Sequence, residues 1–219
     1  MTTAAVFGCT GAFPSIKTIS RRLPKLQSSK LQALEESDVS KLAGMVASLS
    51  PKPSLVFNAV GTTRAAAGGI QNQWKIDHDS CIENARAAKD AGVKTYVIIS
   101  SAGTRGVFSG YVPCSKMKVG VEDSIKELNF ENSIILRPGM ILGSDTPKAP
   151  LSESIVGNLD KLGQGVQDLI DQTIIGRAAV AAARMVAEGR ALSKYWVVEM
   201  ADIVKLGKYL EAIMLRLLC

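Results

Sequence analysis

The sequence predicts an α/β protein with a Rossmann-like, doubly wound and mostly parallel sheet, folded as a single domain over residues 1–219. Apolar runs of strand length alternate along the chain with helical stretches, and this order is typical of parallel strands covered by helices on both faces. A chain of 219 residues with 47% hydrophobic residues is also large enough to bury one substantial core. From about residue 144 onward the pattern becomes less regular.

The strands and helices are predicted in the following order. Asp38 or Ser40 can cap a helix, Gly92 can end a long helix, and Pro113 fits the first turn of the next one. The predicted helices are therefore residues 38–49, 69–91, 113–128, 174–190 and 201–219. The predicted strands are AAVFGCT (4–10), IKTIS (16–20), SLVFNAV (54–60), TYVIIS (95–100), SIILRPGMIL (133–142) and YWVVEM (195–200).

The composition excludes several classes of function. The formal net charge is +6 with a pI near 9.2, but Lys and Arg alternate with acids, so we predict no nucleic-acid partner. No stretch approaches the roughly 18 apolar residues of a membrane-spanning helix. His78 is the only histidine, which argues against a metal site or a Ser-His triad. The cysteines lack CxxC spacing and indicate a reducing compartment; they are Cys9, Cys81, Cys114 and Cys219.

The N-terminal segment has an unusual charge pattern. No Asp or Glu precedes Glu35, while Lys and Arg accumulate among Ser and Thr from Lys17 onward. This composition is typical of a mitochondrial transit peptide. The alternative is that residues 4–10 and 16–20 are two core strands that happen to lack acids. We favour the structural interpretation, because cleavage after this segment would remove two strands, and we keep an uncleaved targeting role as an alternative.

Two features near the N-terminus suggest a dinucleotide site. The first strand ends in a turn containing Gly8, Thr10 and Gly11, where glycines would let the backbone approach a pyrophosphate. Arg21 and Arg22 end the second strand, where the 2′-phosphate of NADP would lie. An ordinary basic turn explains the two arginines equally well.

Small and hydroxylated residues follow two later strands. The loop NAVGTTR, residues 58–64, comes after one strand, and Ser100 and Ser101 end the next, VIISSAG. The stretch CSKMK then opens a helix. In open α/β sheets, ligands bind outside the carboxyl ends of the strands. We therefore expect these residues to gather at one edge of the sheet.

Four stretches together carry a resemblance to a known family: GTTRAAAGG, ISSAG, KMKVGVEDSIKEL and ILRPGMILG. They resemble the atypical short-chain dehydrogenases. More specifically, the chain is similar to the fungal mitochondrial outer-membrane proteins related to the animal Tat-interacting tumour suppressor. The resemblance implies NADP(H) as cofactor, a small carbonyl substrate, and a peripheral location on the cytosolic side of the mitochondrial outer membrane.

The resemblance also implies roles for individual residues. Ser101, with Ser100 as a close second, falls on the serine that orients the substrate carbonyl. Lys118 falls on the lysine that contacts the ribose and lowers the pKa of a catalytic phenol. The implied cofactor contacts are Gly8, Thr10 and Gly11 for phosphate, Arg21 and Arg22 for the 2′-phosphate, Gly61, Thr62 and Thr63 beside the adenine ribose, and Pro138 and Gly139 near the nicotinamide.

The chain departs from that family at the catalytic phenol. Relatives carry a tyrosine four residues before the lysine, which places both side chains on one helix face about 6 Å of rise apart. This chain has Cys114 there, and a thiol is too short to deliver a proton to the same place. Tyr111 is the nearby substitute, but it precedes Pro113 and is expected to lie outside the helix. We prefer to interpret Cys114 as a partly buried thiol at a helix start.

A second departure concerns the first crossover helix, which is missing. Pro14 stands where a third glycine is expected, and four residues, AFPS, separate the glycine turn from the strand at 16–20. Adjacent parallel strands need a crossover of roughly a dozen residues. The strand at 4–10 must therefore pair antiparallel, or one strand lies outside the sheet, or the chain takes another route. In each case the pyrophosphate loses a helix N-terminus, so NADP(H) binding is expected to be impaired.

Two functions follow from these observations. One is an NADPH-dependent carbonyl reductase with Ser101 and Lys118 in the site and Tyr111 or another group as proton donor. The other is a protein of the same fold without turnover, acting as a docking or sensing module at the outer membrane. The tail could lay apolar side chains against a membrane surface, although such a helix more often packs on its own sheet.

Overall fold

The computed structural model describes residues 15–24, 28–106, 111–142 and 169–218. Within these ranges every strand pairing is parallel. A four-stranded sheet has the order β3-β4-β5-β8, and two strand pairs, β1-β2 and β6-β7, stand apart from it. The strands are β1 (Ile16–Ser20), β2 (Leu31–Glu35), β3 (Leu55–Asn58), β4 (Thr95–Ile99), β5 (Asn132–Arg137), β6 (Met140–Leu142), β7 (Leu169–Asp171) and β8 (Tyr195–Glu199).

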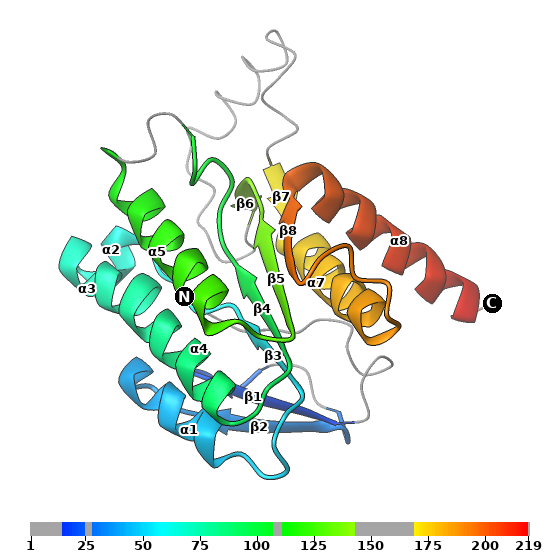
Figure 1. The fold of residues 1–219 in the computed structure, drawn as a ribbon, viewed down its shortest axis with the longest axis horizontal. Helices are drawn as coiled ribbons and strands as arrows, with labels where there is room; N and C mark the ends of the chain where they lie inside the picture. The colour runs from blue at the N-terminus through cyan, green and yellow to red at the C-terminus, as the bar shows by residue number, and fades with distance from the viewer. Residues whose placement is uncertain (1–14, 25–27, 107–110, 143–168, 219) are drawn as a thin grey trace, which may run out of the picture.

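Helices cover both faces of the four-stranded sheet, so the predicted α/β class is confirmed (Figure 1). On one side lie α4 (Ser80–Asp90) and α5 (Pro113–Leu128), and on the other α7 (Gln172–Ala187) and α8 (Met200–Leu218). Short helical segments join the strands near the N-terminal half. They are the 3-10 turn Val39–Lys41, α1 (Leu42–Ser48), α2 (Arg64–Ala67), α3 (Ile70–Trp74) and a π-helical turn at Lys75–Asp79.

The alternation of side chains along the strands builds two cores. In β4, Tyr96 and Ile98 face α4 and α5, whereas Val97 faces α7. In β5, Ile135 joins the first core while Ile134 joins the second. Each of these five side chains is at most 2% exposed. Strands buried on both faces need apolar residues at every position, which explains why their sequences read as continuous apolar runs.

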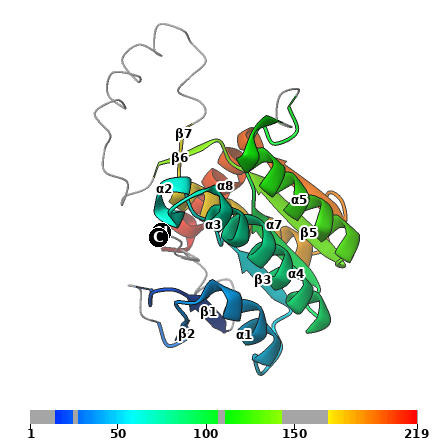
Figure 2. The same ribbon diagram turned by 90° about the vertical axis from the view of Figure 1, so that its left-hand side faces the viewer.

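The N-terminal pair β1-β2 differs from expectation. The strand IKTIS forms as predicted, but it pairs in parallel with Leu31–Glu35, a segment that the sequence did not indicate as a strand. Every position of that segment is half-buried or exposed, and it has no continuous apolar run. Figure 2 shows the pair beneath the larger sheet, next to α1. The predicted strand at residues 4–10 and the region of the missing crossover helix lie outside the described residues.

The strand predicted over residues 133–142 is also divided. β5 ends at Arg137, and β6 begins at Met140 and pairs with β7 rather than continuing the main sheet. Pro138 stands between them, and proline has no N–H to give to a strand ladder. β7 was not predicted.

The predicted helix boundaries lie within a few residues of those in the structure. Asp38 caps its segment as expected, because its carboxylate accepts a hydrogen bond from Ser40 N over 3.0 Å.

The long helix predicted over residues 69–91 is interrupted. It passes from α3 through the π-helical turn into α4, and Gly92 ends it with the left-handed φ of 82°. A single π-helical turn inserts one residue and re-aims the side chains around it, and such turns are frequent at functional sites. This one carries Asp77 to the carboxyl edge of the sheet, where the site residues lie.

Candidate functional site at the carboxyl edge of the sheet

The predicted site residues of the main sheet share one edge. Because β3, β4 and β5 are parallel, the segments that follow them lie at their common carboxyl end. These segments carry Gly61 to Thr63, Ser100 and Ser101, and Pro138 and Gly139. A cavity of about 20 Å³ lined by Arg21, Val60 and Ile76 places the end of β1 beside the end of β3. Arg22 is exposed, and Gly8, Thr10 and Gly11 lie outside the described residues.

The structure separates the roles of the two serines. Ser100 is buried, and its hydroxyl donates to the Glu122 carboxylate over 2.6 Å. Ser101 is half-buried, and its hydroxyl donates weakly to the Ala102 carbonyl over 3.4 Å. The Ser100 hydroxyl is therefore engaged in a buried structural hydrogen bond. Ser101 is the serine of the two whose side chain is more open to solvent, while its role toward a substrate stays a prediction.

Lys118 lies at the end of β4, on the inner side of α5. Its ammonium group donates to the Ile99 carbonyl over 3.4 Å. It also lies near the buried thiol of Cys81, whose pKa is raised to about 11 because burial disfavours the thiolate, while the charge of Lys118 opposes that rise. The lysine is therefore held next to the strand end that carries Ser101.

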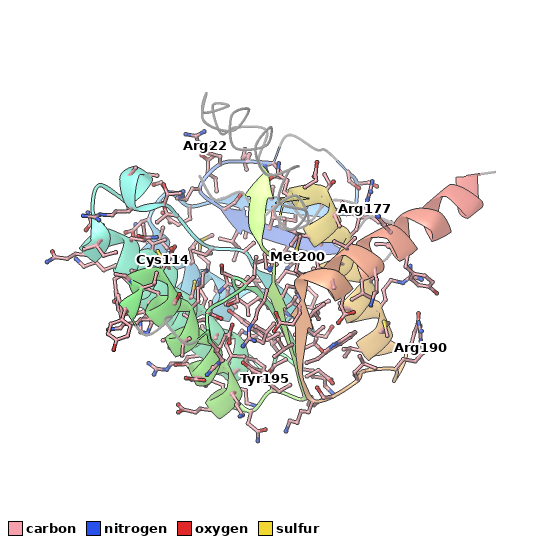
Figure 3. All side chains as sticks on the ribbon, turned by 90° about the horizontal axis from the view of Figure 1, so that it is seen from above. Arg22, Cys114, Arg177, Arg190, Tyr195 and Met200 are labelled. Atoms are coloured by element: carbon pink, nitrogen blue, oxygen red, sulfur yellow. The ribbon has the colours of Figure 1, made fainter. Side chains whose placement is uncertain are left out.

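Cys114 lies in the first turn of α5, four residues before Lys118, and its side chain is exposed. The prediction of a partly buried thiol is therefore wrong, because this first turn, with Val112 and Pro113, lies open to solvent. The amide nitrogen of Gln73 approaches its sulfur to 3.7 Å. Figure 3 shows Cys114 where α5 meets the α3 segment. Tyr111 precedes α5 and is 85% exposed, so its phenol extends into solvent. The structure thus offers no support for Tyr111 as a replacement proton donor.

Gln73 and Asp77 tie the loop after β3 to the start of α5. Asp77 accepts from Thr62 N over 2.6 Å, and Gln73 donates both to the Thr62 carbonyl over 3.3 Å and to Asp77 over 3.2 Å. Both side chains are about 95% buried. The sequence alone did not point to this pair. The available signal was two polar residues four positions apart inside the helix predicted over residues 69–91.

Glu122 is the centre of a buried ionic cluster, to which the sequence alone did not point either. Its carboxylate is 1% exposed and accepts from Arg137 Nη2 over 2.6 Å and from Arg105 Nε over 3.3 Å. Arg137 extends the cluster to Glu199 over 2.8 Å. Burial raises the pKa of Glu122, but hydrogen bonds from Arg137 and Ser100 outweigh it and hold that pKa below its ordinary value. The cluster joins α5 to the ends of β4, β5 and β8.

Pro138 and Gly139 close the far side of the edge. Pro138 is buried, and its carbonyl accepts from Ala102 N over 2.8 Å. Gly139 N lies 3.4 Å from the sulfur of Met200, the first residue of α8. Figure 3 shows Met200 on the opposite side of the site from Cys114. The strand end near the predicted nicotinamide position is therefore packed between the loop after β4 and α8.

The described residues fit the cofactor only in part. Lys118 and Ser101 lie at the carboxyl end of β4, Lys118 through its contact with the Ile99 carbonyl, and Arg22 is exposed just after β1. The amide of Thr62 is already occupied by Asp77, so it is not offered to a phosphate. Among the described residues, no cluster of three or more His, Cys, Asp or Glu side chains could hold a metal ion.

The fold defines the class: an α/β protein with a Rossmann-type parallel sheet. The chain is similar to MoeE5 in complex with UDP-glucose and NAD, with a TM-score of 0.61 and 16% identity over 93% of this chain and 76% of that one. It is also similar to a short-chain dehydrogenase from Streptomyces avermitilis, with a TM-score of 0.55 and 16% identity over 93% of this chain and 86% of that one. No protein-family model matches the chain.

Sequence relatives narrow this class to a family. The chain is 69% identical to Protein fmp52-2, mitochondrial, of Neosartorya fischeri, over 95% of this chain and 97% of that protein. It is 50% identical to Protein fmp-52, mitochondrial, of Neurospora crassa, over 88% of this chain and 84% of that protein. The chain therefore belongs to the fmp52 family of mitochondrial proteins. The predicted resemblance to fungal mitochondrial proteins is confirmed, while the relation to the animal tumour suppressor stays a prediction.

Proposed function

We propose that this protein binds NADP(H) weakly as a short-chain-dehydrogenase-type protein on the cytosolic face of the mitochondrial outer membrane, and that it lacks efficient carbonyl reduction. One observation carries the proposal: Cys114 occupies the helical position one turn before Lys118 at which the resembled enzymes carry their catalytic phenol. Such a site suits docking or sensing of the cofactor better than turnover.

Each remaining residue would act on the cofactor or on a small carbonyl substrate. Arg22, together with Arg21, would bind the 2′-phosphate, and Lys118 would donate to the ribose. Ser101 would donate to the substrate carbonyl. When bound, NADP(H) supplies a hydride. The thiol of Cys114 is shorter than a phenol and has the Gln73 amide 3.7 Å from its sulfur, so it would not reach the substrate oxygen that a phenol protonates.

The binding half of the proposal is tested by calorimetric titration of NADPH into the full-length protein. We expect a dissociation constant in the high micromolar range, weaker binding of NADH, and at least tenfold weaker NADPH binding by Arg22→Glu. Arg22→Lys is the matched control and should retain most of the affinity. A silent titration, or equal affinity for NADH and NADPH, would contradict the proposal.

The catalytic half is tested by restoring the phenol. Cys114→Tyr should raise NADPH oxidation with a panel of ketones and aldehydes by about 10²-fold or more, because general acid–base groups contribute about 10² to 10⁴ in rate. Cys114→Ser, of nearly the same size as the original residue, should stay at background. Efficient turnover by the unaltered protein would show that the thiol is no obstacle.

The peripheral location is supported by family membership and by the apolar C-terminal helix. None of the described helices combines the length and hydropathy needed to cross a membrane. On intact mitochondria we expect added protease to digest the protein, and on washed membranes we expect alkaline carbonate to release it. Protection from protease until the outer membrane is ruptured would place the protein inside the organelle and refute this part of the proposal.

A further inference from the structure

A cavity of about 310 Å³ lies away from the candidate site, with β1 on one side and β3 on the other. Helix α1 lines it as well, and α4 and β4 contribute one residue each. Ser15 and Lys52, which line the cavity just before β1 and β3, are exposed, whereas Asn58 at the end of β3 is buried. The cavity therefore opens at the amino ends of the strands, at the edge opposite to Ser101.

The size and the wall of this cavity suit a small organic molecule. An apolar cavity of about 150 Å³ in an engineered protein holds benzene, and natural ligand sites begin at about 300 Å³. The wall is predominantly apolar, with Leu42 and Val46 from α1 and Val56 and Phe57 from β3. Such a wall binds a hydrocarbon body by removing it from water. The cavity has room for a ring system about twice the size of benzene.

Two polar side chains in the wall have atoms without hydrogen-bond partners. They are Thr18 of β1, with its hydroxyl oxygen, and Asn84 of α4, with its amide oxygen. Each residue is only 7% exposed. Four buried side-chain atoms in the described part of the chain lack a partner, and two of the four belong to residues of this one wall. Buried unpaired polar atoms destabilise a fold, so their presence calls for a functional explanation.

Two other buried polar residues of the wall are paired with each other. The Asn58 amide nitrogen donates to the Tyr96 hydroxyl over 2.8 Å, and the Asn58 amide oxygen accepts from Val60 N over 2.9 Å. Thr18 and Asn84 are therefore the groups of the wall that are open to a ligand. An amide oxygen can only accept a hydrogen bond, while a threonine hydroxyl can donate one as well.

We propose that this cavity binds a small apolar alcohol or phenol. The ligand hydroxyl donates to the Asn84 amide oxygen and accepts from the Thr18 hydroxyl, and its hydrocarbon body lies between α1 and β3. Every buried residue of the wall is uncharged, so a neutral hydroxyl fits it better than a carboxylate or a phosphate. Binding here requires no cofactor, so the inference is independent of the proposed function.

The test titrates 2-naphthol into the full-length protein by calorimetry and compares it with 2-methoxynaphthalene, which keeps the ring system but has no proton to donate. We expect saturable binding of 2-naphthol and at least tenfold weaker binding of the methyl ether, because the Asn84 oxygen would stay unpaired. Saturating NADPH should leave the affinity unchanged, since the cavity opens at the opposite edge. A silent titration, which is also the result expected where another part of the chain occupies the cavity, would overturn the proposal. Equal affinity for the two compounds, or displacement by NADPH, would overturn it too.

Point variants locate the bound molecule. Thr18→Val keeps the side-chain shape, removes the hydroxyl and should weaken 2-naphthol binding about fivefold to tenfold. Thr104→Val is the matched control, because Thr104 is also buried with an unpaired hydroxyl but does not line the cavity, and it should leave the affinity unchanged. Val46→Phe should fill the cavity from α1 and abolish binding. Should Thr18→Val unfold, Asn84→Leu provides the second variant, with loss of the preference for 2-naphthol over its methyl ether. Equal effects of the two threonine substitutions, or unchanged binding by Val46→Phe, would refute the inference.

Discussion

Replacing Glu122 with glutamine removes one charge from the buried cluster that joins α5 to three strand ends. The carboxylate is 1% exposed and accepts four hydrogen bonds, from Ser100 over 2.6 Å, from Arg137 over 2.6 and 3.0 Å, and from Arg105 over 3.3 Å. Glutamine has nearly the same shape, so the substitution changes charge and donor pattern without leaving a cavity. Its amide N–H groups would then face guanidinium donors.

The size of the expected loss of stability depends on which other carboxylate partners Arg137 and Arg105 keep. Breaking a buried ion pair by removing one partner costs about 3 to 5 kcal/mol, because the remaining charge is left uncompensated. Here Arg137 keeps Glu199 at 2.8 Å and Arg105 keeps its contact with Asp123. We therefore expect a loss near the lower limit, about 3 kcal/mol. For a chain of this size, that corresponds to a fall in Tm of roughly 6 to 12 °C.

The substitution should also change the response to acid. Although burial raises the pKa of Glu122, the hydrogen bonds from Arg137 and Ser100 lower it more, so the folded-state pKa lies below the unfolded value of about 4.3. Stability from this group is fully present above about pH 4.3 and is lost as pH falls through the folded-state pKa. The difference in stability between wild type and Glu122→Gln should thus be constant from pH 5 to 7 and should shrink in stronger acid.

Urea unfolding monitored by far-ultraviolet circular dichroism measures both effects. Glu127→Gln is the matched control, since Glu127 is exposed on the same helix and its replacement should stay within about 0.5 kcal/mol. Arg137→Met and the double variant complete a cycle that isolates the Glu122 pairing. A loss below about 1 kcal/mol for Glu122→Gln, or the same difference from wild type at pH 3 and pH 7, would refute the reasoning.

Three further predictions can be checked by the same unfolding measurement. Gly207→Ala should destabilise by about 1 to 3 kcal/mol, because its Cβ would lie 2.5 Å from an Ile174 methyl carbon, whereas Gly176→Ala, with nothing within 4 Å, should stabilise by about 0.5 to 1 kcal/mol. Asp171→Ala should cost about 1 kcal/mol by removing the N-cap of α7, and the cost should fall below pH 4 because the capping hydrogen bonds lower the pKa of Asp171. Tyr96→Phe should cost about 1 to 3 kcal/mol, because the buried Asn58 amide loses its acceptor at 2.8 Å.

The main sheet could be predicted because burial imposes a pattern on the sequence. A strand covered on both faces, such as β4 or β5, excludes polar residues at successive positions, so it is visible as an apolar run. The pair β1-β2 lacks that double cover, and Leu31–Glu35 therefore has the polarity of a loop. β7 is three residues long and is specified by its pairing with β6 rather than by its own composition.

The candidate site could be predicted only where a residue stands at a strand end. Ser101 follows a strand that the sequence identifies, so its place at the carboxyl edge follows from parallel pairing. Pro138 and Gly139 lie inside the strand predicted over residues 133–142, and their place at the edge became visible only because β5 ends at Arg137. Glu122 and Gln73 lie on helices, and their roles depend on hydrogen bonds and ion pairs with residues of other elements. No local sequence pattern encodes such long-range contacts. For Glu122 the sequence offered one signal: a charged residue four positions after Lys118, on the helix face that is otherwise apolar.

The Glu122 cluster and the exposed Cys114 are therefore under different constraints. The Glu122 cluster fixes the ends of β4, β5 and β8 through buried charges, and it does so whether or not a cofactor binds. Cys114 lies outside that cluster and is exposed, so its identity can change with little effect on folding. This is why the exchange of Cys114 for tyrosine tests chemistry rather than stability. A tyrosine at position 114 would stand one turn before Lys118 without disturbing the buried cluster, so any reductase activity that it brought would come from the phenol itself.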